Sequence, residues 1–196
     1  DEIDFALRSD ILMFNVESSE ELGVIDERAG LMGRKARISL RINPDVDPRT
    51  HPHISTGLKT NKFGINIEKS LDEYRRARTL PHVEIVGVDC HIGSQVTQIS
   101  PFVDALERLK NLIGRLREEG IEIRYLDLGG GLGITYNEEM PPHPEEYARA
   151  IIDSAGDLKV TFIFEPGRVI VGNAGILVSR VLYTKGNEEK NFVIVD

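Results

Sequence analysis

Short apolar runs of strand length alternate along this chain with longer segments of helical periodicity. Such an alternation predicts a parallel sheet built from right-handed βαβ units, because parallel neighbours need a crossover connection. Five strands follow this pattern. They are expected at residues 11–16, 36–42, 83–92, 121–128 and 160–164.

Capping signals in the sequence predict where the helices between these strands begin. Ser18, with Glu21 three residues later, predicts a capping box. Ser100-Pro101 predicts another helix start, with serine as the cap and proline in the first position. Together with apolar periodicity, these signals predict helices at residues 17–30, 67–80, 100–120 and 144–155. Residues 176–183 and 191–195 then predict an antiparallel hairpin.

Two architectures fit this order of elements, a doubly wound sheet and a β/α barrel. Unusual residues occur where strands stop, at Asn43-Pro44 and at residues 91–94, 129–133 and 165–168. In a β/α barrel all of these ends open on one face, which holds the active site. We therefore favour the barrel. Five strands cannot close one, so further strands are expected upstream of Asp1 or in another chain.

Composition excludes several classes of partner. The formal net charge of −8 argues against nucleic acids and anionic membranes, because binding many phosphates needs a basic face. No apolar run approaches the length of a membrane span. One small anionic ligand, held by local dipoles, is compatible with this charge. Cys90 is the single cysteine, so we expect no disulfides and a reducing, cytoplasmic setting.

Three consecutive glycines, Gly129, Gly130 and Gly131, follow the fourth expected strand. Glycine fills no space in a strand and loses more entropy on folding than other residues. The cluster is therefore either a mobile loop or a cradle of backbone N–H groups for a phosphate. Phosphate sites in β/α barrels commonly use the last two strands, which favours the cradle.

Four side chains at strand ends are candidates for chemistry. His91 is either a core histidine or a titratable ring at the barrel mouth, with Ser94 donating to a phosphate. Glu165 follows an apolar strand, where a carboxylate is unfavourable unless a cation faces it. That cation is Arg168, another arginine such as Arg41, or a protonated cofactor nitrogen. Arg168 is either this partner or a bidentate hydrogen-bond donor to a phosphate or carboxylate.

The segment 45–64 is long for a passive connection, and loops of this length are usually functional. We expect its Lys59 and Lys62 to be solvated. A Schiff-base lysine should stand on a strand end, where burial depresses its pKa, and no strand expected here offers one. His51 and His53 are too far from any cysteine or paired histidine to suggest a metal site.

Taken together, residues 90–95 (Cys-His-Ile-Gly-Ser-Gln), 128–133 and 165–168 resemble the barrel domain of the fold type III pyridoxal-phosphate decarboxylases. Residues 43–45, 51–57 and 62–64 are more similar to the diaminopimelate branch than to ornithine or arginine decarboxylases. The resemblance implies pyridoxal 5′-phosphate as cofactor. It also implies decarboxylation of meso-diaminopimelate to L-lysine, in lysine biosynthesis.

The resemblance implies a role for each candidate residue. His91 would stack on the pyridine ring, Ser94 would hold the phosphate, and Glu165 would pair with the ring nitrogen. Arg168 would also grip the distal carboxylate of the substrate. The implied cofactor cradle further comprises Gly130, Gly131, Pro166, Gly167 and Arg168.

Chemistry supports the role of Glu165 independently. A carboxylate keeps the pyridine nitrogen protonated, so that the ring accepts the electron pair left by decarboxylation. The related racemase barrels place an arginine at this position, which weakens the electron sink. Glu165 therefore favours decarboxylation over racemisation.

In this family the Schiff-base lysine lies on the first barrel strand, and a catalytic cysteine and a substrate tyrosine lie in a second, β-rich domain. We therefore expect this chain to be a fragment, inactive alone. Residues 1–175 would hold barrel strands four to eight, and residues 176–196 the opening hairpin of the second domain. The full-length protein is expected to be a homodimer.

Three alternatives stay open. The first is another fold type III decarboxylase, acting on ornithine, arginine or carboxynorspermidine. The second is a sugar-phosphate isomerase or aldolase barrel, which would leave Glu165 without a ring to face. The third is a non-catalytic homologue, in which the motifs should have decayed. His91, Ser94, Gly131, Glu165 and Arg168 are nevertheless all present.

Overall fold

The computed structural model describes residues 1–48 and 62–196. Its main sheet is parallel, and the strand order follows the chain order. The strands are shorter than the apolar runs, because only part of each run pairs with a neighbour. In order they are β1 (Phe14–Val16), β2 (Ala36–Asn43), β4 (Val83–Asp89), β5 (Tyr125–Asp127) and β6 (Thr161–Ile163), with β3 (Ile65–Asn66) paired to β2.

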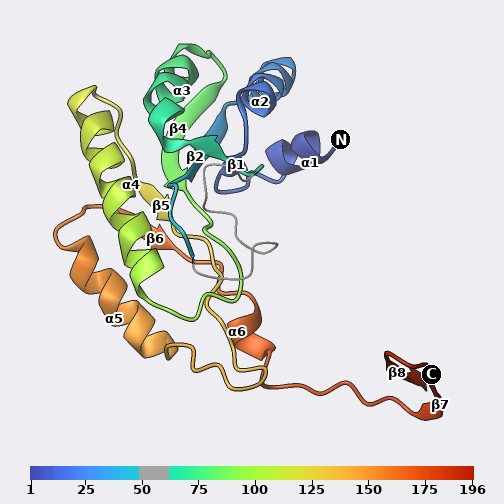
Figure 1. Ribbon diagram of the computed structural model, residues 1–196. Coiled ribbons are helices and arrows are strands. Elements are labelled where there is room, and N and C mark those ends of the chain that lie inside the picture. Colours follow the sequence, from blue (N-terminus) through green and yellow to red (C-terminus); the bar gives the residue numbers. More distant parts are fainter. Residues whose placement is uncertain (49–61) are drawn as a thin grey trace.

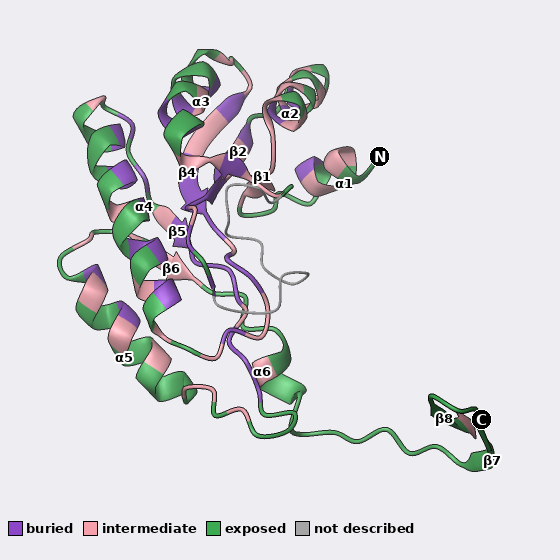
Figure 2. Ribbon diagram, viewed as in Figure 1, coloured by how far each residue is buried: buried purple, intermediate pink, exposed green. Residues whose placement is uncertain are grey.

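The crossover helices between the strands pack against one side of this sheet (Figure 1). Each right-handed crossover to the next strand in the same direction places its helix on the same face. Buried residues accordingly line the inner faces of the helices and the strands (Figure 2). The helices are α1 (Glu2–Arg8), α2 (Ser19–Leu31), α3 (Ile67–Thr79), α4 (Ser100–Glu118), α5 (Pro144–Ala155) and α6 (Arg168–Val171).

The sheet is strongly curved. Asn15 of β1 and Asp127 of β5 are three strand positions apart, which would separate them by about 14 Å in a flat sheet. The side-chain amide of Asn15 nevertheless donates a hydrogen bond to Oδ2 of Asp127 at 3.2 Å. Only a sheet curled around a lumen brings these strands within reach. The expected incomplete β/α barrel is therefore confirmed.

The four helices expected from the sequence begin within two residues of the observed starts. Oγ of Ser18 accepts from the N–H of Glu21 at 3.2 Å, while the Glu21 carboxylate accepts from the N–H of Glu17 at 2.6 Å. The expected capping box is thus present, with its second bond one residue earlier. The expectation that Ser100 caps α4 is wrong, because Ser100 is already helical and Ile99 is the cap residue.

Replacing Ser18 with alanine should lower the free energy of unfolding by about 1 kcal/mol, because the N–H of Glu21 in the first turn of α2 loses its side-chain acceptor. Urea unfolding of the protein measures this change. Ser19→Ala is the matched control, since Ser19 does not cap the helix and alanine is a good helix former. Equal loss in both variants would contradict the role of Ser18.

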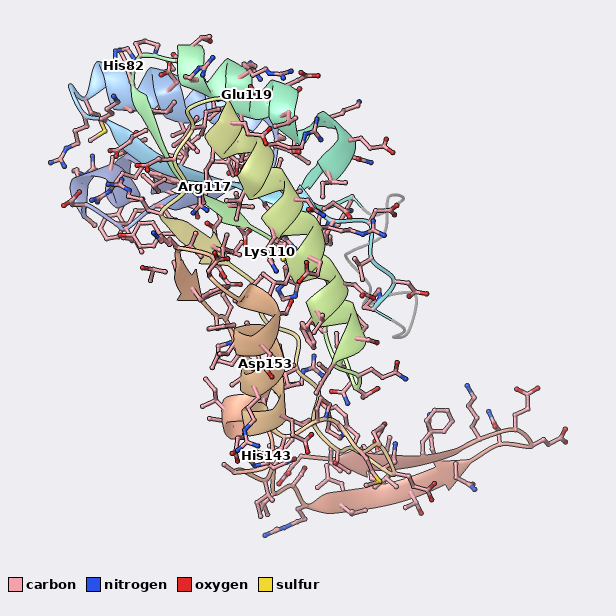
Figure 3. The ribbon with its side chains drawn as sticks, turned by 90° about the vertical axis from the view of Figure 1, so that its left-hand side faces the viewer. His82, Lys110, Arg117, Glu119, His143 and Asp153 are labelled. Carbon is pink, nitrogen blue, oxygen red and sulfur yellow. The ribbon has the colours of Figure 1, made fainter. Side chains whose placement is uncertain are left out.

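Helices α4 and α5 lie side by side on the outer side of the sheet (Figure 3). Nζ of Lys110 donates to the carbonyl of Ser154 at 2.5 Å and pairs with Glu107 at 2.9 Å. The rings of Phe102 and Tyr147 also meet edge to face, with their centroids 4.8 Å apart. These contacts hold α4 and α5 together.

The C-terminal hairpin consists of β7 (Val181–Gly186) and β8 (Asn191–Val195), and an extended segment separates it from the barrel (Figure 1). Because β7 continues to Gly186, Lys185 lies within a strand, but it is not the buried strand-end lysine that a Schiff base was expected to need. Lys185 is exposed, with Nζ 5.6 Å from the centroid of Phe192. Within residues 1–48 and 62–196, no helix is both long and apolar enough to cross a bilayer.

Candidate functional site

Three strand ends meet at one edge of the curved sheet. The N–H of Cys90, just after β4, donates to the carbonyl of Asp127 at 2.9 Å. The N–H of Glu165, just after β6, donates to the carbonyl of Gly129 at 2.7 Å. The structure therefore brings together His91, the glycine run and Glu165, as the barrel arrangement predicts.

The glycines are packed tightly between their neighbours. A Cβ added to Gly130 would lie 1.8 Å from the carbonyl oxygen of Glu165, and one added to Gly131 would lie 1.9 Å from that of Gly93. Gly129 and Gly131 also have φ angles of +63° and +104°, which side chains with a Cβ rarely adopt. Each glycine thus lets an adjacent strand end approach closely, and the cluster is a packed turn rather than a free loop.

Some of the N–H groups of this turn have hydrogen-bond acceptors within the protein, and one has none in the described residues. That of Gly129 donates to Oδ1 of Asp127 at 2.9 Å, and that of Gly130 donates to Nδ1 of His91 at 3.2 Å. Within the described ranges, the N–H of Gly131 and the hydroxyl of Ser94 make no hydrogen bond. Gly131 and Ser94 are therefore the donors that the local fold leaves to a ligand.

His91 is half-buried and presents Nδ1 as an acceptor to Gly130. Burial lowers the pKa of His91, and the nearby guanidinium of Arg41 lowers it further, while Asp127 and Glu17 act in the opposite direction. The ring is therefore neutral at pH 7, with its proton on Nε2. A neutral, fixed aromatic ring at the mouth suits contact with a flat ligand.

Glu165 has no ionic partner in the part of the chain that the structure describes. Loss of solvent around the carboxylate raises the pKa of Glu165, and the charge of Asp127 raises it further. Arg41, one of the two arginines expected as partners, instead pairs with Glu17. Glu165 is exposed rather than buried by the apolar strand before it, and in the described residues its carboxylate lies unpaired beside the glycine turn.

Arg168, the other expected partner, is also engaged elsewhere. Its Nη1 donates to the hydroxyl of Tyr136 at 2.9 Å, and its guanidinium carbon lies 5.9 Å from the centroid of that ring. Tyr136 has no distinguishing pattern around it, so sequence reasoning missed it. The side chain of Arg168 is exposed at the site and remains able to bind a carboxylate through its other nitrogens.

Gln95 is a second residue whose role the sequence did not reveal. Its amide accepts from the N–H of Ile134 at 3.1 Å and donates to the carbonyl of Ile134 at 2.5 Å. A bridge between Val96 and Leu132 lies next to this pair. Gln95 thus holds the loop that carries Ser94 against the loop that follows the glycines.

Two buried aspartates lie directly beneath the site. Asp89 and Asp127 are paired in register on β4 and β5, and only 3% and 2% of their surfaces are exposed. Burial, followed by the charge of Asp127, raises the pKa of Asp89 to about 8, against the opposing charge of Arg41. The protonated form of Asp89 is therefore favoured. An acidic residue within an apolar strand was the only signal in the sequence.

This shift predicts a stability that depends on pH. The pKa of Asp89 is about 8 in the folded state and about 4 when unfolded, so folding takes up a proton between these values. The stabilising contribution is complete below about pH 4 and is lost as pH rises toward 8. Asp89→Asn should remove at least about 2 kcal/mol of the loss between pH 5 and 8, measured by urea unfolding. Exposed Asp153→Asn is the control, and equal pH profiles for wild type and Asp89→Asn would contradict the assignment.

The other residues singled out in the sequence belong to the long segment 45–64. Lys62 is exposed, with Nζ 5.0 Å from the centroid of Phe63, as expected of a solvated lysine. Lys59, His51 and His53 lie outside the described residues. In the ranges that are described, no group of three or more histidine, cysteine or acidic side chains is placed to hold a metal ion.

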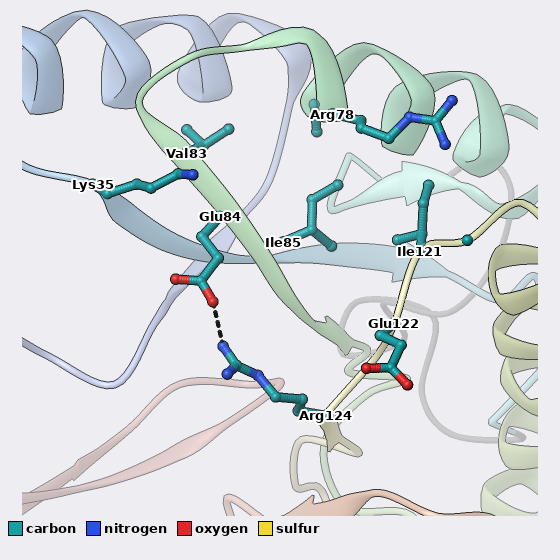
Figure 4. Close-up of a pocket in the computed structure, with 10 residues that line it drawn as sticks. Lys35, Arg78, Val83, Glu84, Ile85, Ile121, Glu122 and Arg124 are labelled. Carbon is teal, nitrogen blue, oxygen red and sulfur yellow. Dashed lines mark hydrogen bonds and ion pairs between the residues drawn. The ribbon is translucent and has the colours of Figure 1, made fainter.

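A hollow of about 390 Å³ lies at the opposite, amino-terminal end of the strands (Figure 4). Glu84 and Arg124 form an ion pair of 2.6 Å there, and Lys35, Arg78 and Glu122 also line it. In β/α barrels, this end contributes to stability rather than catalysis. The strand ends around His91 therefore remain the candidate site.

Comparison with known proteins shows which family the chain belongs to. The family model described as "Pyridoxal-dependent decarboxylase, pyridoxal binding domain" matches residues 1–172. The chain is 53% identical over its whole length to a diaminopimelate decarboxylase from Haemophilus influenzae, and 55% identical to one from Pseudomonas aeruginosa. It spans about half the length of these relatives, 48% and 47% respectively.

Solved structures of similar proteins share the fold of this chain. The crystal structure of diaminopimelate decarboxylase from Helicobacter pylori, complexed with L-lysine, matches the whole chain with a TM-score of 0.91 and 44% identity, and the chain covers 49% of it. A lysine decarboxylase from Selenomonas ruminantium has a TM-score of 0.82 at 23% identity, which shows the shared fold alone.

Proposed function

The chain belongs to the pyridoxal-dependent decarboxylases, as part of their pyridoxal-binding domain, and we propose that its full-length protein converts meso-diaminopimelate to L-lysine. The substrate follows from the curated relatives, which are named diaminopimelate decarboxylases and share 53% and 55% of residues with the chain. A relative with L-lysine bound supports the same product.

The residues present fit pyridoxal 5′-phosphate. A phosphate needs donors that the fold has not already used, and the hydroxyl of Ser94 and the N–H of Gly131 are such donors in the described ranges. Gly130 allows the close contact with residue 165 that keeps the turn in shape. Gly130, Pro166, Gly167 and Arg168 complete the proposed cradle.

The observation that carries the proposal is the unpaired carboxylate of Glu165 beside the glycine turn. This carboxylate is exposed at the mouth of the site and free to accept a cation, and a protonated pyridine nitrogen is a fitting one. A sugar phosphate has no such group. Glu165 therefore favours the cofactor over the isomerase and aldolase alternatives.

Each residue then has a distinct task. Bound pyridoxal phosphate supplies a ring that accepts the electron pair left when carbon dioxide departs. Glu165 keeps a proton on the ring nitrogen, and His91 supports the flat face of the ring. Ser94 and Gly131 hold the phosphate, and Arg168 binds the distal carboxylate of the substrate.

The remaining parts of the site are proposed to lie outside this chain. A lysine that binds the cofactor covalently, together with the other catalytic groups, would come from the rest of the full-length protein. We place that protein in lysine biosynthesis, as a cytoplasmic homodimer. The residues 1–175 would be its partial barrel, and residues 176–196 would begin its β-rich domain.

Replacing Ser94 with alanine should weaken pyridoxal phosphate binding by roughly ten- to a hundredfold, because a donor to a charged group is lost. Titration of the full-length apoprotein with the cofactor, followed by absorbance, measures this change. Ser100→Ala is the control, since Ser100 is exposed on α4 and outside the cradle. A cofactor affinity unaffected by Ser94→Ala would contradict the phosphate contact.

A further inference from the structure

Asp127 lies at the end of β5 with 2% of its surface exposed, and the mechanism above does not use it. A carboxylate in such a place is unfavourable unless hydrogen bonds compensate for its lost solvation. Its contacts are therefore the first indication of what it does.

These contacts join three separate elements. Oδ1 of Asp127 accepts from the N–H of Gly129 at 2.9 Å, and Oδ2 accepts from the side-chain amide of Asn15 on β1 at 3.2 Å. The main-chain carbonyl of Asp127 accepts from the N–H of Cys90 at 2.9 Å. One buried residue thus fixes the first peptide of the glycine turn to the barrel wall and to the strand end before His91.

The next N–H of the turn acts on His91. Gly130 donates to Nδ1 of His91 at 3.2 Å, which makes Nδ1 an acceptor and puts the proton of the neutral ring on Nε2. The space beside Gly129 is filled by the same ring, since an added Cβ would lie 2.8 Å from Nδ1. The orientation of the turn therefore sets both the position and the tautomer of the imidazole.

The neighbouring charges show that Asp127 cannot achieve this through charge alone. Asp89 on β4, Arg41 on β2, and the carboxylates of Glu17 and Glu165 also face this layer. The charge of Asp127 raises the pKa of His91, which would favour protonation of the ring rather than its neutral form. Any contribution to the neutral tautomer must come from the geometry of the Gly129 contact.

We propose that Asp127 is a positioning residue of the cofactor site, which fixes the glycine turn so that Gly130 holds His91 with its proton on Nε2. This inference rests on the proposed function and deepens it. It predicts that the reach of the side chain at position 127 matters more than its charge.

Two variants distinguish the effect of the length of the side chain at position 127 from the effect of its charge. Asp127→Asn keeps an oxygen at the same reach and loses the charge, whereas Asp127→Glu keeps the charge and moves the carboxylate by one methylene. The full-length protein, labelled with ¹⁵N-histidine and studied without cofactor, reports the tautomer of His91 through its ring nitrogen shifts. Loss of one signal in His91→Asn identifies the resonance.

The asparagine variant is expected to keep Nδ1 unprotonated and to bind pyridoxal phosphate within about threefold of wild type. The glutamate variant is expected to show a mixture of tautomers and a cofactor dissociation constant raised roughly ten- to a hundredfold, as for a lost hydrogen bond to a charged group. If Asp127→Glu does not fold, Asp127→Ala replaces it, because alanine is neutral like asparagine but carries no acceptor for the N–H of Gly129.

Wild-type tautomer and cofactor affinity in the glutamate or alanine variant would overturn the proposal. Equal effects of the asparagine and glutamate variants would overturn it as well. A protein that shows the predicted tautomers but binds no pyridoxal phosphate would contradict the proposed function and leave the positioning role intact.

Discussion

Replacing Gly130 with alanine is expected to abolish cofactor binding and to lower the free energy of unfolding by about 3 kcal/mol or more. The added Cβ would lie 1.8 Å from the carbonyl oxygen of Glu165, a main-chain atom that cannot rotate away. The N–H of Glu165 is also hydrogen-bonded to Gly129 at 2.7 Å, so relief of the clash separates the two strand ends. Glu165 and His91 would then lose their positions together.

Gly114→Ala is the matched control, because Gly114 lies within α4 and an added Cβ meets nothing within 4 Å. That variant should be more stable than wild type by roughly 0.5–1 kcal/mol, as expected for alanine in a helix. Urea unfolding gives both values, and a cofactor titration of the full-length protein gives the affinity. A Gly130→Ala protein with wild-type stability would contradict the packing of the glycine turn.

Replacing Glu165 with glutamine should lower kcat of the full-length enzyme by roughly 10²–10³-fold, the size of effect seen when one preorganised electrostatic contact is removed. The side chain keeps its shape but no longer stabilises a proton on the ring nitrogen, so the cofactor becomes a weaker electron sink. We expect KM to change little, because the carboxylate does not contact the substrate in this proposal.

Glu122→Gln is the control, since Glu122 lies at the opposite end of the strands (Figure 4). Steady-state kinetics of both variants, with cofactor content determined for each, distinguish weakened catalysis from lost cofactor. Activity of Glu165→Gln within about threefold of wild type, at full cofactor occupancy, would show that Glu165 does not tune the ring.

The fold was largely predictable because its cues are local. Apolar runs and the capping signal at Ser18 placed the strands and helices to within a few residues, and the alternation predicted a parallel sheet. Strand ends such as that of β5 were less predictable, because the length of a strand depends on how far its neighbours pair with it. The register that brings Asn15 to Asp127 depends on curvature, which no local cue encodes.

The site was predictable where a residue type is unusual for its position. His91, the glycines and Glu165 all follow the ends of apolar strands, and the structure brings them together. Asp127 and Gln95 act through bonds to the backbone of other segments, and such bonds cannot be inferred from residue type. For the same reason, the partners of Arg41 and Arg168 differ from those expected, since Glu17 and Tyr136 reach them only after folding.

We propose that this chain contributes the cofactor site of a decarboxylase that acts on diaminopimelate. The most direct test measures the product formed by the purified full-length protein from meso-diaminopimelate, ornithine, arginine and carboxynorspermidine, with and without pyridoxal phosphate. We predict L-lysine and carbon dioxide from meso-diaminopimelate, only when the cofactor is present, and little product from the other three. Decarboxylation of another of these amino acids in preference, or no decarboxylation by the cofactor-loaded protein, would contradict the claim.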